Sequence, residues 1–249
     1  MVNHEREAWL LKVWRRAISA IDVDNAARLE ELLEQEPEIR SLQDPSEDAP
    51  TLLHAATMRD KLACVRILAK GKCNIHHIIS RKYGEPCVKT PMELAIYCVD
   101  PLLRRELFDS LMMAAEPGIG ESAQGWQAAM FAAAYRGDED ILAAINSHCG
   151  QEGRALWGQI RDEDGFSILH AAAVGQSDSV KTLRMLLSWE GMEAALEHRD
   201  GMGRKPRDLT HNEEFIQELD TFARARAEAE EISKAAKAPE ELRGKAARL

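Results

Sequence analysis

The residues with the clearest capacity for chemistry are a group of cysteines and histidines between residues 73 and 98. Cys73, His76, His77 and Cys87 are of types that bind zinc. Their spacing lacks the paired C-x-x-C or H-x-x-x-H arrangement of structural zinc sites, and Cys98 lies in an Ala-rich segment that predicts a buried helix. The residue types leave a metal site open, but the spacing favours cysteines that fill a core. We therefore predict no metal and no other cofactor.

Two further motifs match catalytic signatures only in part. Residues 117–120 begin a G-x-G-x-x-A string, but a nucleotide-binding loop follows a strand, and residues 112–116 read as the end of a helix. His198-Arg199-Asp200 matches the kinase catalytic triplet without its downstream Asn or a Gly-rich loop. A hydrolase needs a nucleophile, a base and an orienting acid held together, and no such set stands out. We predict that the chain is not an enzyme.

His54 and His170 have an explanation other than catalysis, because they occupy the same place in a repeated segment. Residues 51–56 (TLLHAA) recur as residues 167–172 (SILHAA), and weaker copies follow the same frame. The copies start at residues 51, 90, 128, 167 and 205, and a degenerate first unit starts near residue 12. Such even spacing indicates a repeat architecture of stacked units.

Each unit is predicted to contain a turn, a short Ala-rich helix, a break and a longer Leu-rich helix. The D-x-x-G lead-ins at Asp162 and Asp200 predict tight turns, since Gly supplies a positive φ and Asp bonds its own backbone. Gly137 marks the break in the fourth unit. Amphipathic runs at residues 24–33, 62–68, 139–145 and 179–187 predict the second helices.

This pattern resembles the ankyrin repeat family, whose signature is T-P-L-H-x-A. Thr51, His54, Ser167 and His170 match it best, and the resemblance implies that these side chains fix the turn and the start of the helix. The steps of 38–39 residues exceed the family's 33, and the fourth unit has Ala128 and no His in the frame. Longer loops and irregular stacking are therefore expected.

The expected fold is an all-α ankyrin-type solenoid of about six helix-turn-helix units with β-turn or hairpin-like loops and a C-terminal helix. Residues 1–222 would form the repeat domain. Residues 223–249 would form a charged Ala/Glu/Lys/Arg-rich helical tail, which Pro239 interrupts.

Composition limits the partners and the compartment. The formal net charge of −10 argues against broad binding to nucleic acid or anionic membrane. Five cysteines without a pairing pattern, no signal peptide and no long apolar run predict an intracellular, cytoplasmic protein, with the nucleus left open. We expect a monomer.

The predicted function is protein–protein interaction, as an adaptor or scaffold that binds through the concave face and the turn tips. The alternative is a regulatory or targeting subunit of an enzyme complex, or a secreted pathogen effector with the same fold. Tyr97 and Tyr135 could instead fill gaps between helices, and the locally basic loop at residues 80–89 could be a solvated loop. The predicted partner-binding residues are Pro50, Met58, Arg59, Arg81, Lys82, Tyr97, Tyr135, Arg136, Phe166 and Arg204.

Overall fold

The computed structural model describes residues 2–43, 50–71, 73–75, 90–115, 123–175 and 180–246. The chain divides into two compact units. The N-terminal unit contains Met1–Ala133 and Asp140–Glu152, and the C-terminal unit contains Ala134–Glu139 and Gly153–Leu249. Each unit is described by itself below.

Three of the Ala-rich first helices begin where the repeat frame predicts. They are α3 (Leu52–Met58), α5 (Pro91–Ile96) and α9 (Ile168–Val174), and their N-cap residues are Thr51, Thr90 and Ser167. A Ser or Thr at this position accepts a hydrogen bond from a backbone N–H of the first helical turn, so the helix begins directly after it. The recurring Thr or Ser therefore sets the start of the first helix in these repeats.

The first helices of repeats 1 and 4 begin earlier than the frame predicts. They are α1 (Val2–Asp22) and α7 (Ala123–Arg136), so residues 12 and 128 lie inside helices. Lys12 and Ala128 are poor N-cap residues, and the helix continues through both positions. The Asn25 N–H donates to the Ala20 carbonyl just as the Lys61 N–H donates to the Ala56 carbonyl, so Ala20 is equivalent to Ala56. Because Ala56 lies five residues after the start of its repeat at Thr51, the first repeat begins near residue 15.

The second helices are α2 (Ala26–Gln35), α4 (Leu62–Lys70), α6 (Pro101–Met112), α8 (Glu139–Trp157) and α10 (Val180–Leu187). The four amphipathic runs predict all of these except α6. Three of the breaks between first and second helices have a residue with positive φ: Asp24, Asp60 and Gly137. Asp and Gly are among the residues that adopt this conformation most readily. The α8 helix is kinked at Gly150, where φ is 59° and ψ is −149°.

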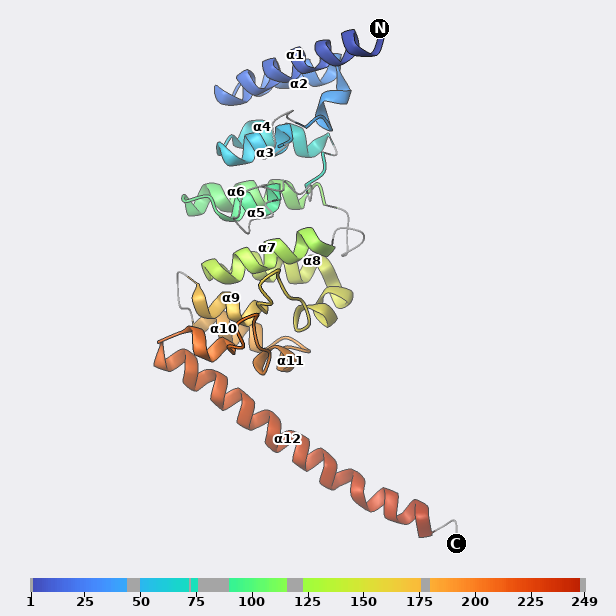
Figure 1. Ribbon diagram of the computed structural model, residues 1–249, viewed down its shortest axis with the longest axis vertical. Helices are drawn as coiled ribbons and strands as arrows, with labels where there is room; N and C mark the ends of the chain where they lie inside the picture. Colours follow the sequence, from blue (N-terminus) through green and yellow to red (C-terminus); the bar gives the residue numbers. More distant parts are fainter. Residues whose placement is uncertain are drawn as a thin grey trace. The chain divides into compact units, whose positions relative to one another are not determined.

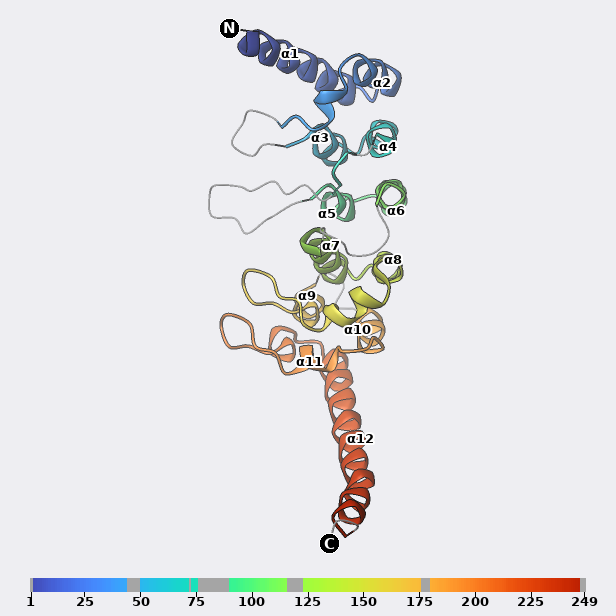
Figure 2. The same ribbon diagram turned by 90° about the vertical axis from the view of Figure 1, so that its right-hand side faces the viewer.

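In the N-terminal unit the helix pairs stack in two layers. Figure 2 shows α1, α3 and α5 in one column and α2, α4 and α6 in the other, and successive helices of each column contact one another. The core between the layers consists of Ala from the first helices and larger apolar residues from both, among them Ile21, Leu33, Leu53, Val65 and Phe108, all fully buried. No single pair covers its own apolar face, so stacking is what buries it.

The C-terminal unit is built from helices of more varied length and type. It contains α9, α10, a one-turn helix α11 (Glu193–Leu196), the 3₁₀ helix η3 (Pro206–Leu209) and the long helix α12 (Glu213–Ala246). Helix η3 takes the place of the first helix in repeat 6. Only the start of α12 packs against α10, α11 and η3, and the rest extends beyond them (Figure 1).

Helix α12 continues through Pro239, where the sequence suggests an interruption. The domain boundary expected at residue 222 lies within this helix and stays a prediction. Phe215 and Leu219 are buried, whereas Glu228 and Ile232 are exposed, so packing ends within the first third of the helix. Alanine and the Glu230–Lys234 ion pair favour helix in the remainder.

The part of the chain that the structure describes is all-α, apart from the 3₁₀ turns η1 (Pro37–Arg40) and η3 and one antiparallel bridge between Gln43 and Thr51. This confirms the predicted fold class. Across these same residues, every helix is too short or too polar to cross a membrane.

Candidate functional site

The turn before α9 is built on the side chain of Asp162. Its Oδ1 accepts hydrogen bonds from the backbone N–H groups of Asp164 (3.0 Å) and Phe166 (2.7 Å). Gly165 follows with a φ of 78°, and the Asp162 N–H donates to the Phe166 carbonyl (3.0 Å). The D-x-x-G motif thus forms the tight turn that the sequence predicts.

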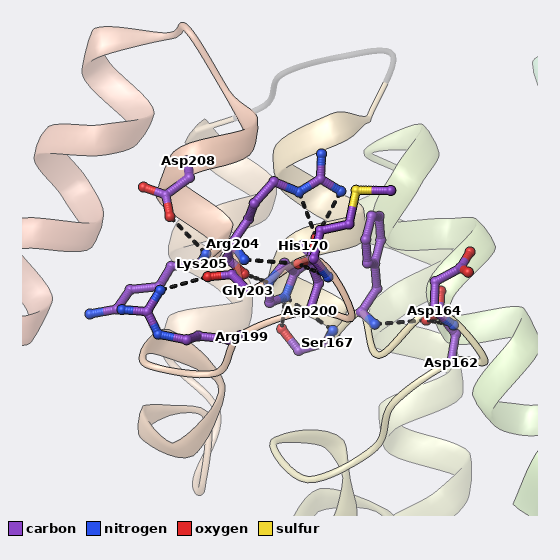
Figure 3. Close-up of polar contacts among 12 residues, drawn as sticks. Asp162, Asp164, Ser167, His170, Arg199, Asp200, Gly203, Arg204, Lys205 and Asp208 are labelled. Carbon is purple, nitrogen blue, oxygen red and sulfur yellow. Dashed lines mark hydrogen bonds and ion pairs between the residues drawn. The ribbon is translucent and has the colours of Figure 1, made fainter.

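The turn before η3 repeats this pattern one repeat later. Oδ1 of Asp200 accepts from the N–H groups of Met202 and Arg204, both at 2.9 Å, and Gly203 has a φ of 80°. This confirms that His198-Arg199-Asp200 belongs to a turn. Asp162–Phe166 and Asp200–Arg204 are called the turn pair below (Figure 3).

One backbone hydrogen bond connects the two turns directly, and a second hydrogen bond joins the later turn to α9, which follows the earlier one. The N–H of Gly201 donates to the Asp164 carbonyl (2.8 Å), and a Cβ on Gly201 would lie 2.9 Å from that same oxygen. Nε2 of His170 lies 3.0 Å from the Arg204 carbonyl. The two turns are therefore held at a fixed spacing by backbone groups and one imidazole.

The hydrogen bonds of His170 define its protonation. The backbone N–H of Ser167 donates to Nδ1 (3.1 Å), and the Ser167 hydroxyl lies 2.7 Å from the same nitrogen. Because Nδ1 accepts, the proton of the neutral ring is on Nε2, which donates to the Arg204 carbonyl. His170 is fully buried. It therefore fixes the start of α9 and joins it to the next turn, as the family resemblance implies.

The same hydrogen bond to the start of the helix recurs in repeat 2 with a His and in repeat 6 with an Asp. Nδ1 of His54, also fully buried, lies 3.2 Å from the Thr51 nitrogen and 2.8 Å from its hydroxyl. In repeat 6, Asp208 replaces His and accepts the N–H of Lys205 (2.8 Å). His54 and His170 are thus structural residues, and they lie in different compact units.

Within the turn pair, Asp200 is paired with Arg204. The Arg204 guanidinium lies 2.8 Å from Oδ2 of Asp200. Burial raises the pKa of Asp200, but the hydrogen bonds from Arg204 and Met202 outweigh this effect and leave the pKa below its ordinary value. Burial raises the pKa of Asp162 more than its backbone hydrogen bonds lower it.

The turn pair brings two predicted partner-binding residues together. The Phe166 ring stacks on His170 with centroids 5.4 Å apart, and the Arg204 guanidinium lies 6.0 Å from the Phe166 ring centre. Met202, two residues before Arg204 in the same turn, has 80% of its surface exposed, and it is absent from the predicted partner-binding residues. Its place between two glycines, at the tip of a turn, is the signal that could have identified it.

A second surface lies at the C-terminal ends of the first helices in the N-terminal unit. Val23 follows α1, Met58 ends α3 and Tyr97 follows α5, and they are 73%, 53% and 37% exposed. Arg59 forms an ion pair with Asp22 (2.8 Å) that joins the first two repeats. Val23, Met58 and Tyr97 are called the helix-end row below.

The other predicted partner-binding residues are placed less favourably. Tyr135 and Arg136, at the end of α7, are half-buried, and the Tyr135 carbonyl is covered closely by Gly175, whose added Cβ would lie 2.3 Å from it. Pro50 is half-buried beside the cap of α3. Arg81 and Lys82 lie outside the described residues.

The cysteines in the described residues are buried thiols. Burial raises the pKa to about 12 for Cys64 and Cys149 and to about 11 for Cys73, and it also raises the pKa of Cys98. A thiol is a poor nucleophile and ligand until it is deprotonated. His76, His77 and Cys87 lie outside the described residues, within which no group of three potential metal ligands occurs.

The geometry of His170 predicts that acid destabilises the C-terminal unit. Burial lowers the pKa of His170, and His198 and Arg161 add to this effect, although the hydrogen bond to Arg204 and the charge of Asp200 oppose it. The unfolded chain therefore binds this proton more readily. Stability is fully present above the ordinary histidine pKa of about 6.5 and falls as the pH drops through that value towards the lower pKa of the folded state.

Urea denaturation monitored at about pH 8 and about pH 5.5 measures this effect, and the midpoint is expected to be lower in acid. The variant His170→Gln removes the titrating group, so its midpoint should depend less on pH across this range. If the urea midpoint changed with pH by the same amount in the wild type and the variant, the prediction would be contradicted.

Comparison with known proteins supports the fold alone. No family model and no curated relative matches the sequence. The solved ankyrin repeat protein EF0377 is similar with a TM-score of 0.57 and 16% identity, over 83% of this chain and 94% of that chain. A chain from the complex of the Bdellovibrio bacteriovorus predatory endopeptidase Bd0816 with the immunity protein Bd3460 is similar with a TM-score of 0.54 and 16% identity, over 82% and 96%.

Proposed function

We propose that this chain, whose fold is of the divergent ankyrin repeat type, is a non-catalytic module that binds another protein through the helix-end row and the turn pair. The observation that carries the proposal is the helix-end row. Successive repeats present large apolar side chains to solvent at the ends of their first helices, whereas the cores behind them are closely filled. Recurrent apolar exposure of this kind is typical of binding surfaces.

The turn pair supports the same function. It is held by backbone N–H groups that donate to Asp162 and Asp200 and by His170, which donates to the Arg204 carbonyl, so its outer side chains are presented by a rigid backbone. The exposed Met202 of one turn, together with the Phe166–Arg204 contact between the turns, combines an adaptable apolar group with residue types that occur in interfaces. A partner would meet a prearranged surface, which lowers the entropic cost of binding.

The expected partner is another protein, because a net charge of −10 opposes close approach to nucleic acid phosphates. We propose that the chain acts as an adaptor or scaffold. The expectations of a monomer and of a cytoplasmic location stay predictions.

A matched pair of substitutions in repeat 2 tests the proposal. Met58 ends α3 within the helix-end row, and the exposed Lys70 ends α4 in the other layer. In a pull-down from cell extract, Met58→Asp is expected to reduce capture of a specific partner at least about tenfold, since a buried charge at an interface core is strongly unfavourable. Lys70→Asp should leave capture unchanged. If both variants captured the same partners equally well, the helix-end row would not be part of the interface.

A regulatory subunit of an enzyme complex is the second candidate. One chain with a similar fold was solved within a complex of an endopeptidase and an immunity protein. The two candidates differ in what the captured partner does. Addition of the purified chain would change the turnover of an enzyme partner in the regulatory case and leave it unchanged in the adaptor case.

A further inference from the structure

We propose that the helix-end row binds a polypeptide segment that combines apolar side chains with positive charge. This inference rests on the proposed function and specifies the chemistry of the partner. It arises from two sets of residues that the N-terminal unit places side by side in the same three repeats.

The first set is apolar. Besides Val23, Met58 and Tyr97, the break between α5 and α6 exposes Val99 (85%) and the first turn of α6 exposes Leu102 (79%). Helix α3 packs directly against both α1 and α5 (Figure 1), and the Asp22–Arg59 ion pair joins the ends of α1 and α3. These side chains therefore follow one another along one edge of the unit, and a single segment of partner chain could contact several of them.

The second set is acidic. The last residue of α1 and the breaks that follow α1, α3 and α5 supply the exposed carboxylates Asp22, Asp24, Asp60 and Asp100. Their own cations are Arg59 and Lys61, so four negative charges stand against two positive ones. Asp22 is neutralised by Arg59 at 2.8 Å. Among the described residues the other three carboxylates form no ion pair.

The three remaining carboxylates also have hydrogen-bond partners. Asp24 and Asp60 lie in the breaks with φ values of 53° and 56°, and their carboxylates hydrogen-bond the buried thiols of Cys64 and Cys98. Asp100 accepts hydrogen bonds from the N–H groups of Leu102 (2.9 Å) and Leu103 (3.2 Å) as the N-cap of α6. Negative charge therefore borders the apolar row in each of the three repeats.

An edge of this composition distinguishes among partners. Fixed carboxylates beside an apolar strip attract a segment with Lys or Arg and repel an acidic one, and such complementarity acts mainly on specificity and on the rate of association. The apolar contacts would supply most of the affinity, since exposed ion pairs contribute little each. The partner is thus expected to be cationic and apolar together, and neither property alone suffices.

Selection from a random dodecapeptide phage library on the immobilised full chain tests this composition. The peptides retained are expected to contain apolar residues and an excess of Lys and Arg over the unselected library. Retained peptides with a neutral or acidic composition would overturn the inference, and so would a library that yields no binder. The pull-down with Met58→Asp judges the proposed function separately.

Binding of the retained peptides to variants locates the surface. The double variant Asp24→Asn, Asp60→Asn removes two charges and keeps residues that tolerate positive φ, and it is expected to weaken binding about fivefold at low salt, with less effect at high salt. The double variant Glu30→Gln, Glu34→Gln removes the same charge from exposed positions of α2, in the other layer, and is the control that should leave peptide binding unchanged. Loss of binding in Met202→Ala with full binding in Asp24→Asn, Asp60→Asn would assign the peptides to the turn pair and refute the inference.

Discussion

Replacing His170 with alanine is expected to lower the free energy of unfolding of the C-terminal unit by about 3 kcal/mol. The imidazole accepts the Ser167 N–H and meets the Ser167 hydroxyl at one nitrogen, and it donates to the Arg204 carbonyl at the other. Its removal leaves these buried polar groups without their partner and opens a cavity beneath the turn pair. Urea denaturation gives the free energy.

Hydrogen exchange shows which backbone amides are destabilised in His170→Ala. The amides of the turn pair, including that of Arg204, are expected to lose protection in His170→Ala. His211→Ala is the control, because His211 is exposed and should change stability by less than about 0.5 kcal/mol. A loss of less than about 1 kcal/mol in His170→Ala would show that the imidazole is not essential to the turn pair.

The second large effect is expected at Gly158, where two backbone segments of the C-terminal unit touch. A Cβ at this position would lie 2.0 Å from the carbonyl oxygen of Gly191 and 3.3 Å from the Met192 nitrogen. Neither contact is with a flexible side chain, so the segment before α11 must move. Gly158→Ala is expected to destabilise the unit by about 3 kcal/mol, at the upper end of the usual cost of overpacking.

Gly191→Ala is the matched comparison because it changes the other member of the same contact. A Cβ there meets nothing within 4 Å, but the φ of 84° strains any residue other than Gly. The expected cost is about 1 kcal/mol, from backbone strain alone. If thermal or urea denaturation ranks Gly191→Ala as the more damaging change, the contact at Gly158 is not a steric constraint.

The sequence predicts much of this fold because the repeat is marked by side chains that act locally. Thr51 and Thr90 cap helices through their own hydroxyls, and Asp162 and Asp200 form turns through their own carboxylates. These interactions span two to four residues, so spacing along the chain is enough to identify them.

The features that the sequence missed depend on what surrounds a residue. The early start of α7 follows from the lack of a cap at Ala128, and the frame gives no other sign of where the helix begins. Conversely, Asp208 performs the function of His170 in a copy that shares only the proline of the signature. Val23, Val99 and Leu102 escaped the site prediction because exposure is not visible in a residue type.

Two predicted site residues show the same limit. Tyr135 and Phe166 are large aromatic residues next to breaks, and the pattern treats them alike. In the structure Tyr135 is half-buried at the end of α7, whereas Phe166 packs between His170 and Arg204 in the turn pair. Only the packing of neighbouring segments separates a residue that fills a gap from one that is held at a surface.

The hydrogen bond from the Gly201 N–H to the Asp164 carbonyl has a consequence for how this surface can change. It joins neighbouring turns through main-chain groups, so the spacing of the turns does not depend on the side chains at their tips. Glu163 and Met202 are both exposed there, and either can be exchanged without loss of that link. Mutation could therefore alter binding specificity at these two tips while leaving folding intact, which makes them suitable positions for redirecting the protein to a new partner.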